Sequence, residues 1–114
     1  MSTFVEKEWF ASRNTVDING MLVYYERLDD TQTGSVAVAL DKARASAMYR
    51  RATRTFEERV NKGTVSVLAL QGAAPLTGGL PIVVGGRVVG GIGVSGGTGD
   101  QDEQVAAAGL ATVK

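Results

Sequence analysis

The sequence of 114 residues contains neither cysteine nor histidine. Without cysteine it can form no disulfide and no thiolate metal site. Without histidine it has no imidazole ligand, no histidine general base and no serine–histidine–aspartate triad. We therefore expect no metal site, and any acid–base chemistry has to come from carboxylates, lysines, arginines or tyrosines.

The sequence also lacks an excess of charge and a long apolar run. Lysine plus arginine number 12, as do aspartate plus glutamate, so the formal net charge is zero. This balance gives no general attraction to nucleic acid or anionic membranes and little repulsion between copies. No apolar run approaches the roughly 20 residues of a membrane span, and the first ten residues lack a signal-peptide core. We expect a cytoplasmic protein that associates with itself, without nucleic-acid or membrane partners.

Length and composition predict one globular domain over residues 1–114, with 44% hydrophobic and 21% charged residues. The clearest local pattern in the first half is a hairpin. Residues 15–18 and 21–28 favour strands, and Asn19-Gly20 between them is a preferred two-residue hairpin turn. Ahead of it, the apolar spacing over residues 2–13 predicts a short helix that docks on the domain.

A second hairpin is predicted in the other half, with strands over residues 80–84 and 87–94 around a Gly-Gly turn. In its later strand Gly91 and Gly93 fall on one face, which would let a helix or a ligand approach the backbone closely. Residues 64–70 favour a further strand, although their alternation is weaker.

Three further segments favour helices. The first runs to about Arg51 with Ser35 as its N-cap. Its apolar stripe leaves Lys42 outside, and consists of Val36, Leu40, Ala43 and Ala47. The second is short, begins at Thr53 or Thr55 and ends before Gly63, with Thr55 and Glu58 as a capping box.

The last helix is predicted over residues 100–110, with Thr98 and Gln101 at its cap and Val105 and Ala108 on its inner face. The sequence therefore predicts an α+β fold, an antiparallel sheet with helices on its faces. The sheet would contain the four strands of the two hairpins, with residues 64–70 as a fifth.

Two stretches carry a resemblance. They are LDKARASAMYRRAT (residues 40–53) and GGLPIVVGGRVVGGIGVSGGTGDQDEQVAAA (residues 78–108). Through them the chain resembles the GlcG/HbpS family, whose domain also occurs at the C-terminus of PduO-type proteins. The resemblance covers residues 16 to 110 and leaves residues 1–14 as an atypical N-terminal segment. It implies a profilin-like fold with a five-stranded antiparallel sheet, assembly into homo-multimers, and heme or another tetrapyrrole as the cofactor class.

A basic cluster follows the first helix. Arg50 and Arg51, near Thr53, could clamp an anion, because a guanidinium matches a carboxylate bidentately. Cations at a helix C-terminus are equally explained by the helix dipole. The resemblance favours Arg51, because the family motif has a basic residue there.

The glycine-rich turn after the last strand is the second candidate region. It matches G-x-G-x-x-G, but the β–α–β unit of a dinucleotide site is missing, so a tight turn accounts for the pattern. Its amides, over Ser95, Gly96 and Thr98, could still receive a carboxylate at the helix N-terminus. Asp102 could orient a ligand, or it could simply complement the helix dipole.

Three functions stay open. The first is a multimeric small-molecule-binding protein of the GlcG/HbpS type with an anionic or tetrapyrrole ligand. Its candidate heme ligands are Tyr24, Tyr25 and Tyr49, together with Met21 and Met48 as weak axial ligands if they are not core residues. The second is a small cofactor-independent isomerase or lyase using Lys42, Tyr49 or Asp102. The third is an accessory subunit of a larger enzyme.

Overall fold

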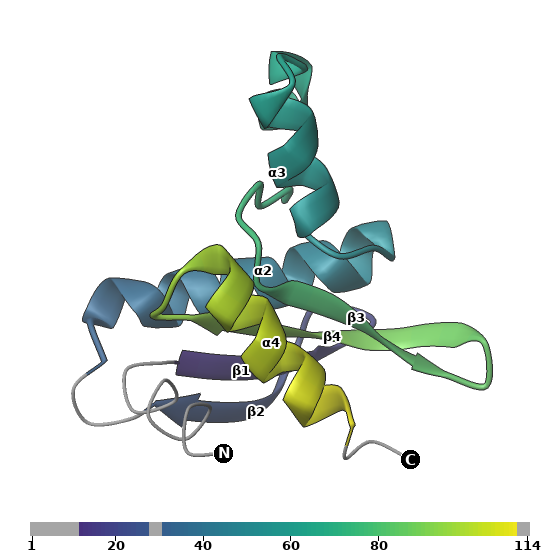
Figure 1. The fold of residues 1–114 in the computed structure, drawn as a ribbon. Coiled ribbons are helices and arrows are strands. Elements are labelled where there is room, and N and C mark those ends of the chain that lie inside the picture. Colours follow the sequence, from purple (N-terminus) through teal and green to yellow (C-terminus); the bar gives the residue numbers. More distant parts are fainter. Residues whose placement is uncertain (1–11, 28–30, 112–114) are drawn as a thin grey trace.

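A computed structural model describes residues 12–27 and 31–111. These residues form a four-stranded antiparallel sheet in the order β2-β1-β4-β3, with α2 and α4 packed on it and α3 projecting away from it (Figure 1). The strands are β1 (Ser12–Asp17), β2 (Leu22–Arg27), β3 (Gly79–Val84) and β4 (Arg87–Ser95). The helices are α2 (Thr33–Tyr49), α3 (Arg54–Asn61), the 3-10 helix η1 (Val65–Ala69) and α4 (Gly99–Leu110).

The strand expected over residues 64–70 is wrong, so the described sheet has four strands rather than five. Those residues turn as η1 because Gly63, at φ 99°, ends α3 and the chain continues to coil. Only Val67 of η1 is buried, whereas Val65 and Leu68 are exposed. One buried side chain, that of Val67, is enough to anchor a short 3-10 helix. A strand over the same residues would need an apolar face of alternating buried side chains.

The hairpin between β3 and β4 is confirmed. Gly85 and Gly86 have φ values of 59° and 78°, and Val84 pairs with Arg87 across the turn. Both turn residues therefore adopt the left-handed conformation that glycine tolerates best.

The hairpin between β1 and β2 is confirmed, but its turn differs from the expected two-residue form. The amide of Gly20 donates to the Asp17 carbonyl, and the Asp17 amide donates to the Met21 carbonyl, so three residues form the loop. Only Gly20 has a positive φ there, at 81°. The Asp17 carboxylate also accepts from the amides of Asn19 and Met21, which favours this wider turn.

The glycine face of β4 is confirmed as the place where α2 packs. A Cβ built on Gly93 would lie 2.5 Å from the Ala43 amide nitrogen and even closer to the Ala39 carbonyl oxygen. A Cβ on Gly91 would likewise meet the backbone of Ala43. The helix can lie this close only because β4 has no side chains at these two positions.

The opposite face of β4 carries α4. Ile92 and Val94 form a buried cluster with Val105 and Ala106. The predicted capping box of Thr98 and Gln101 is confirmed. Ala108, expected on the inner face, is exposed. The buried face of α4 consists of Asp102, Val105 and Ala106, and Ala108 points away from it.

Other helix starts also differ from expectation. The N-cap of α2 is Gln32, so Ser35 lies inside its first turn. Of the two starts expected for α3, Thr53 is confirmed as its N-cap, because the Thr53 carbonyl accepts the first amides of the helix. The capping box expected of Thr55 and Glu58 is therefore wrong, since Thr55 lies inside the helix. Of the helix expected over residues 2–13, residues 2–11 lie outside the described residues, and the last two belong to β1. No helix in the described ranges is long and apolar enough to cross a membrane.

Candidate functional site

A buried ion pair joins the two helices that cover opposite faces of the sheet. Nζ of Lys42, on α2, lies 3.1 Å from Oδ2 of Asp102, on α4, and donates to the Val94 carbonyl oxygen at 2.9 Å. The two side chains are only 4% and 5% exposed. The expectation that Lys42 lies off the buried stripe of its helix is therefore wrong. Its charge is accommodated because Asp102 and the carbonyl at the end of β4 both accept from it.

Glycines make room for this ion pair. A Cβ on Gly78, whose φ is 138°, would lie 2.7 Å from the Lys42 ammonium nitrogen. The amide of Gly97 donates to Oδ1 of Asp102 at 2.9 Å. Both carboxylate oxygens of Asp102 thus have partners inside the protein.

The ion pair lines a groove, which we call the Lys42–Asp102 groove. The groove encloses about 280 Å³, and an adjoining hollow of about 310 Å³ shares Glu57, Thr77 and Gly99 with it. Glu57 accepts from the Thr77 amide at 2.6 Å and from its hydroxyl at 2.8 Å. The other lining residues of the groove are Val38, Leu76, Ser95 and Gly97, and those of the hollow are Arg54, Glu58, Asn61, Thr98 and Asp100.

Arg54 is the one cation of the hollow, and it is bound to the protein's own carboxylates. It lies 2.6 Å from Asp100 and 3.1 Å from Glu103. Arg54 donates hydrogen bonds to both carboxylates, and these bonds, first that to Asp100, raise the pKa of Arg54 above its ordinary value. The hollow is therefore polar and rich in carboxylates, which favours small polar ligands over large apolar ones.

The structure brings part of the predicted site together. Ser95 and Asp102 line the groove with Lys42, and Thr98 lines the hollow beside it. Gly96, with φ 141°, is exposed in the turn between them. The Gly97 and Thr98 amides, however, donate to the side chains of Asp102 and Gln101. Two donors of the turn are thus already used by the protein.

The other predicted residues lie elsewhere. Arg51 donates to the Tyr49 carbonyl, and its guanidinium carbon lies 5.8 Å from the centre of the Phe56 ring. The Tyr49 hydroxyl donates to the Gln71 carbonyl. Arg50 is exposed in a left-handed conformation at φ 57°, where it ends α2. None of these three side chains lines the groove or the hollow.

Thr53 has a role in the loop that precedes β3. It is fully buried, donates to the Leu76 carbonyl at 2.6 Å and accepts from the Gly79 amide at 2.9 Å. These bonds position the loop that carries Thr77 into the groove. Thr53 therefore supports the groove from behind.

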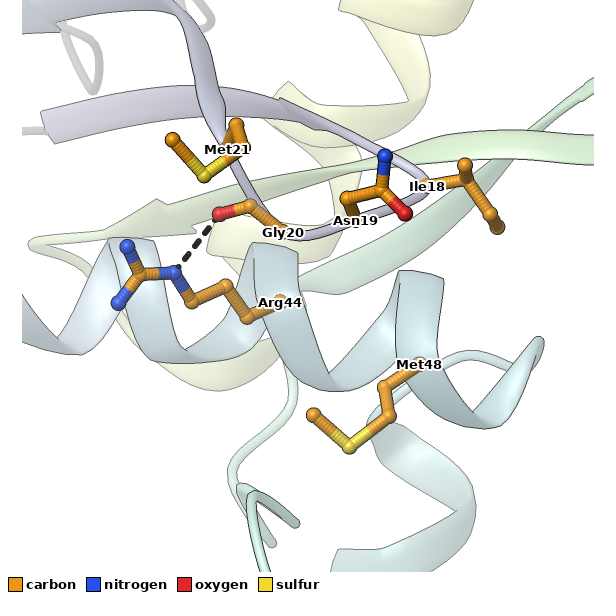
Figure 2. A pocket seen from close by; sticks show the side chains of 6 residues that line it. All are labelled: Ile18, Asn19, Gly20, Met21, Arg44 and Met48. Atoms are coloured by element: carbon orange, nitrogen blue, oxygen red, sulfur yellow. Dashed lines mark hydrogen bonds between the residues drawn. The ribbon is translucent and has the colours of Figure 1, made fainter.

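A second pocket was not predicted from the sequence as a unit. It encloses about 450 Å³ between the β1–β2 turn and α2, and we call it the Arg44 pocket (Figure 2). Arg44 donates through Nε to the Gly20 carbonyl at 3.0 Å. The residues that line it are Ile18, Asn19, Gly20, Met21, Arg44 and Met48. The available signal was the i, i+4 spacing of Arg44 and Met48, which places both on one side of α2.

Comparison with known sequences supports the family resemblance. The family model described as "Haem degrading protein HbpS-like" matches residues 2–111. Protein GlcG of Escherichia coli K12 is 38% identical over 90 residues, which are 79% of this chain and 67% of that protein. An uncharacterized 15.0 kDa protein of Citrobacter freundii is 32% identical over 97 residues, 82% of this chain and 68% of that protein.

Solved structures agree with the sequence matches. A double mutant of HbpS from Streptomyces reticuli superposes with a TM-score of 0.86 at 31% identity, covering 97% of this chain and 79% of that one. The PduOC–heme complex superposes with a TM-score of 0.79 at 27% identity, covering 91% and 78%. The expected resemblance to GlcG, HbpS and the PduO C-terminal domain is thus confirmed, and the chain belongs to the HbpS-like family.

Proposed function

We propose that this chain is a small-molecule-binding protein with an anionic ligand, for which heme or another tetrapyrrole is the first candidate, and that it acts as a homo-multimer. The observation that carries the proposal is the likeness to the solved PduOC–heme complex over 91% of this chain. The HbpS structures support the same ligand class, because their family model is described as haem degrading.

The side chains present can meet the needs of a tetrapyrrole. The ring requires apolar walls and its propionates require cations, while iron can be held by methionine or tyrosine where histidine is lacking. The Arg44 pocket has an arginine, Met21 and Met48 among its lining residues, and both methionines are more than half exposed. The Lys42–Asp102 groove fits less well, because its ammonium group is already paired with a carboxylate.

Self-association is supported by strand β2. Among the described strands it lies at the edge of the sheet, and it exposes Leu22, Val23, Tyr24 and Tyr25. An exposed apolar edge strand offers unpaired backbone groups and apolar area to a second copy. The balanced net charge does not oppose such contact.

Titration with hemin tests the proposal. We expect a shifted Soret band that saturates at a fixed stoichiometry, and a higher unfolding temperature, because a ligand that binds the folded state stabilises it by mass action. Hemin in buffer is the control, and light scattering gives the mass of the protein. If neither hemin nor iron-free protoporphyrin shifts a band or stabilises the fold, ligand binding of this class is refuted. A monomeric mass at every concentration would refute the multimer.

A second candidate function is a small cofactor-independent acid–base enzyme. The observation that favours it is the buried Lys42–Asp102 pair lining a groove with the hydroxyls of Thr77 and Ser95. Positioned acids and bases of this kind typically contribute about 10²–10⁴-fold to proton transfer.

Deuterium exchange detected by NMR tests this second function on a panel of small hydroxy acids and keto acids. The wild-type protein should exchange the carbon-bound proton of a matching substrate, and Asp102→Asn should slow that exchange about 10²-fold or more. Tyr49→Phe is the matched control, since Tyr49 lies outside the groove and its loss should leave exchange unchanged. An Asp102→Asn variant as fast as the wild type would exclude this role for the carboxylate.

A further inference from the structure

Glu57 presents an oriented carboxylate to the Lys42–Asp102 groove and to the adjoining hollow, since it lines both. Its Oε1 accepts from the Thr77 amide at 2.6 Å and from the Thr77 hydroxyl at 2.8 Å. Within residues 12–27 and 31–111, no hydrogen bond or ion pair of its Oε2 is found. The protein thus fixes one oxygen of this carboxylate and leaves the other for a molecule in the groove.

The buried ammonium of Lys42 lines the same groove. An ammonium has three N–H donors, and the Val94 carbonyl and the Asp102 carboxylate take two of them. The third donor has no partner in the part of the chain that the structure describes. Because the side chain is only 4% exposed, a hydrogen bond from this donor to a bound molecule forms in a medium of low dielectric constant, where it is stronger than in water.

The loop before β3 brings these two groups to one place. Thr77, which holds Glu57, precedes Gly78 in the chain. A Cβ on Gly78 would lie 2.7 Å from the Lys42 ammonium nitrogen. A molecule in the groove therefore meets both a carboxylate oxygen without a partner and an ammonium N–H. This pairing is what proton transfer at carbon requires, namely a base for the proton and a donor for the oxygen on which negative charge develops.

The charges of the lining residues select a class of substrate. Lys42 and Asp102 offset each other, so Glu57 sets the net charge of the groove among its described lining residues. In the hollow, the single positive charge of Arg54 is outnumbered by carboxylates. An anion is therefore repelled, whereas the hydroxyl groups of a neutral molecule can donate to these carboxylates. The lining fits a small neutral hydroxyketone or hydroxyaldehyde, with its carbonyl in the groove and its hydroxyl groups toward the hollow.

We propose that Glu57 is the general base of an enolising site in this groove, that Lys42 donates to the enolate oxygen, and that Asp102 is the positioning residue that holds Lys42. Oε2 of Glu57 takes a proton from the carbon beside the carbonyl, and the electron pair of the C–H bond moves to the carbonyl oxygen. The proton then returns from Glu57 to carbon, so the reaction needs neither an oxidant nor a reductant. This inference rests on the second candidate function, the acid–base enzyme, and it names the base and the substrate class of that site.

Deuterium exchange into hydroxyacetone, followed by proton NMR, tests the site, with pyruvate as the anionic probe of similar size. We expect the wild type to exchange hydroxyacetone faster than the protein-free solution does, and to accelerate pyruvate exchange at least about tenfold less. Glu57→Gln should slow the exchange about 10²-fold or more, because an amide is no base. Its amide oxygen can still accept from Thr77 and keep the loop in place. Asp41→Asn is the matched control, since Asp41 is exposed on α2 and lines neither cavity, and it should leave the rate within about twofold.

Glu57→Asp separates a catalytic from a structural role. It keeps the carboxylate but shortens the side chain, whereas Glu57→Gln keeps the length but loses the base. We expect the Asp variant to exchange hydroxyacetone faster than the Gln variant, and the Gln variant to keep its unfolding temperature within about 2 °C of the wild type. A Gln variant that is faster than the Asp variant would show that Glu57 only supports the loop.

The site and the second candidate function can fail separately. If the wild type exchanges either probe and Glu57→Gln is equally fast, Glu57 is not the base, and the acid–base function stands with Asp102 as its carboxylate. If pyruvate is exchanged faster than hydroxyacetone, the substrate class is wrong. If the wild type accelerates exchange in neither probe and in no member of the acid panel, the second candidate function falls together with this site.

Discussion

Gly93→Ala is expected to destabilise the fold strongly. The new Cβ would lie 2.5 Å from the Ala43 amide nitrogen and closer still to the Ala39 carbonyl oxygen. Both neighbours are backbone atoms of α2, so no side chain can rotate away, and the helix has to leave the sheet. Overpacking of a rigid core costs about 1–3 kcal/mol and more where backbone must move, so we expect about 3 kcal/mol or more. Such a loss is a large part of the 5–15 kcal/mol of a typical domain.

Urea unfolding of Gly93→Ala, with Gly34→Ala as the matched control, measures this effect. Gly34 lies in the first turn of α2, and a Cβ there meets nothing within 4 Å. Alanine at that position should be neutral or mildly stabilising, because it is the better helix former. If the two variants unfold within about 0.5 kcal/mol of each other, the close approach of α2 to β4 is wrong.

The features that the sequence could predict are those set by local chemistry. The Gly-Gly hairpin, the capping box at Thr98 and the glycine face of β4 each depend on residues close together in the chain, and each is confirmed. The first hairpin turn shows the limit of such reasoning. Its dipeptide favours a two-residue loop, yet the Asp17 carboxylate binds two nearby amides and stabilises a wider one.

The features that could not be predicted depend on contacts distant in sequence. Lys42 lies among small residues of α2, and the groups that make its burial favourable, the Val94 carbonyl and the Asp102 carboxylate, come more than 50 positions later. The stretch 64–70 is apolar enough for a strand, but the chain delivers no partner strand to it in the described sheet. The Arg44 pocket likewise needs the β1–β2 turn to meet α2, which no local pattern indicates.

Lys42→Met should destabilise the fold by about 3–5 kcal/mol, the usual loss when one partner of a buried ion pair is removed. The Asp102 carboxylate would stay 5% exposed, with the Gly97 amide as its remaining partner among the described residues. Water cannot readily replace the missing ammonium in a site this closed. Urea unfolding measures the loss, and Lys62→Met, at an exposed position after α3, is the matched control and should change stability by less than about 0.5 kcal/mol.

The double variant Lys42→Met with Asp102→Leu decides what the pair contributes. Replacing both charges with apolar side chains removes the burial penalty of both, so most of the lost stability should return. A residual deficit of about 1 kcal/mol is expected, because the Gly97 amide loses its acceptor. If the double variant is as unstable as Lys42→Met alone, the pair contributes directional bonding that apolar packing cannot replace. If Lys42→Met lowers the free energy of unfolding no more than Lys62→Met does, water reaches the ion pair. Other contacts must then hold α2 and α4 together.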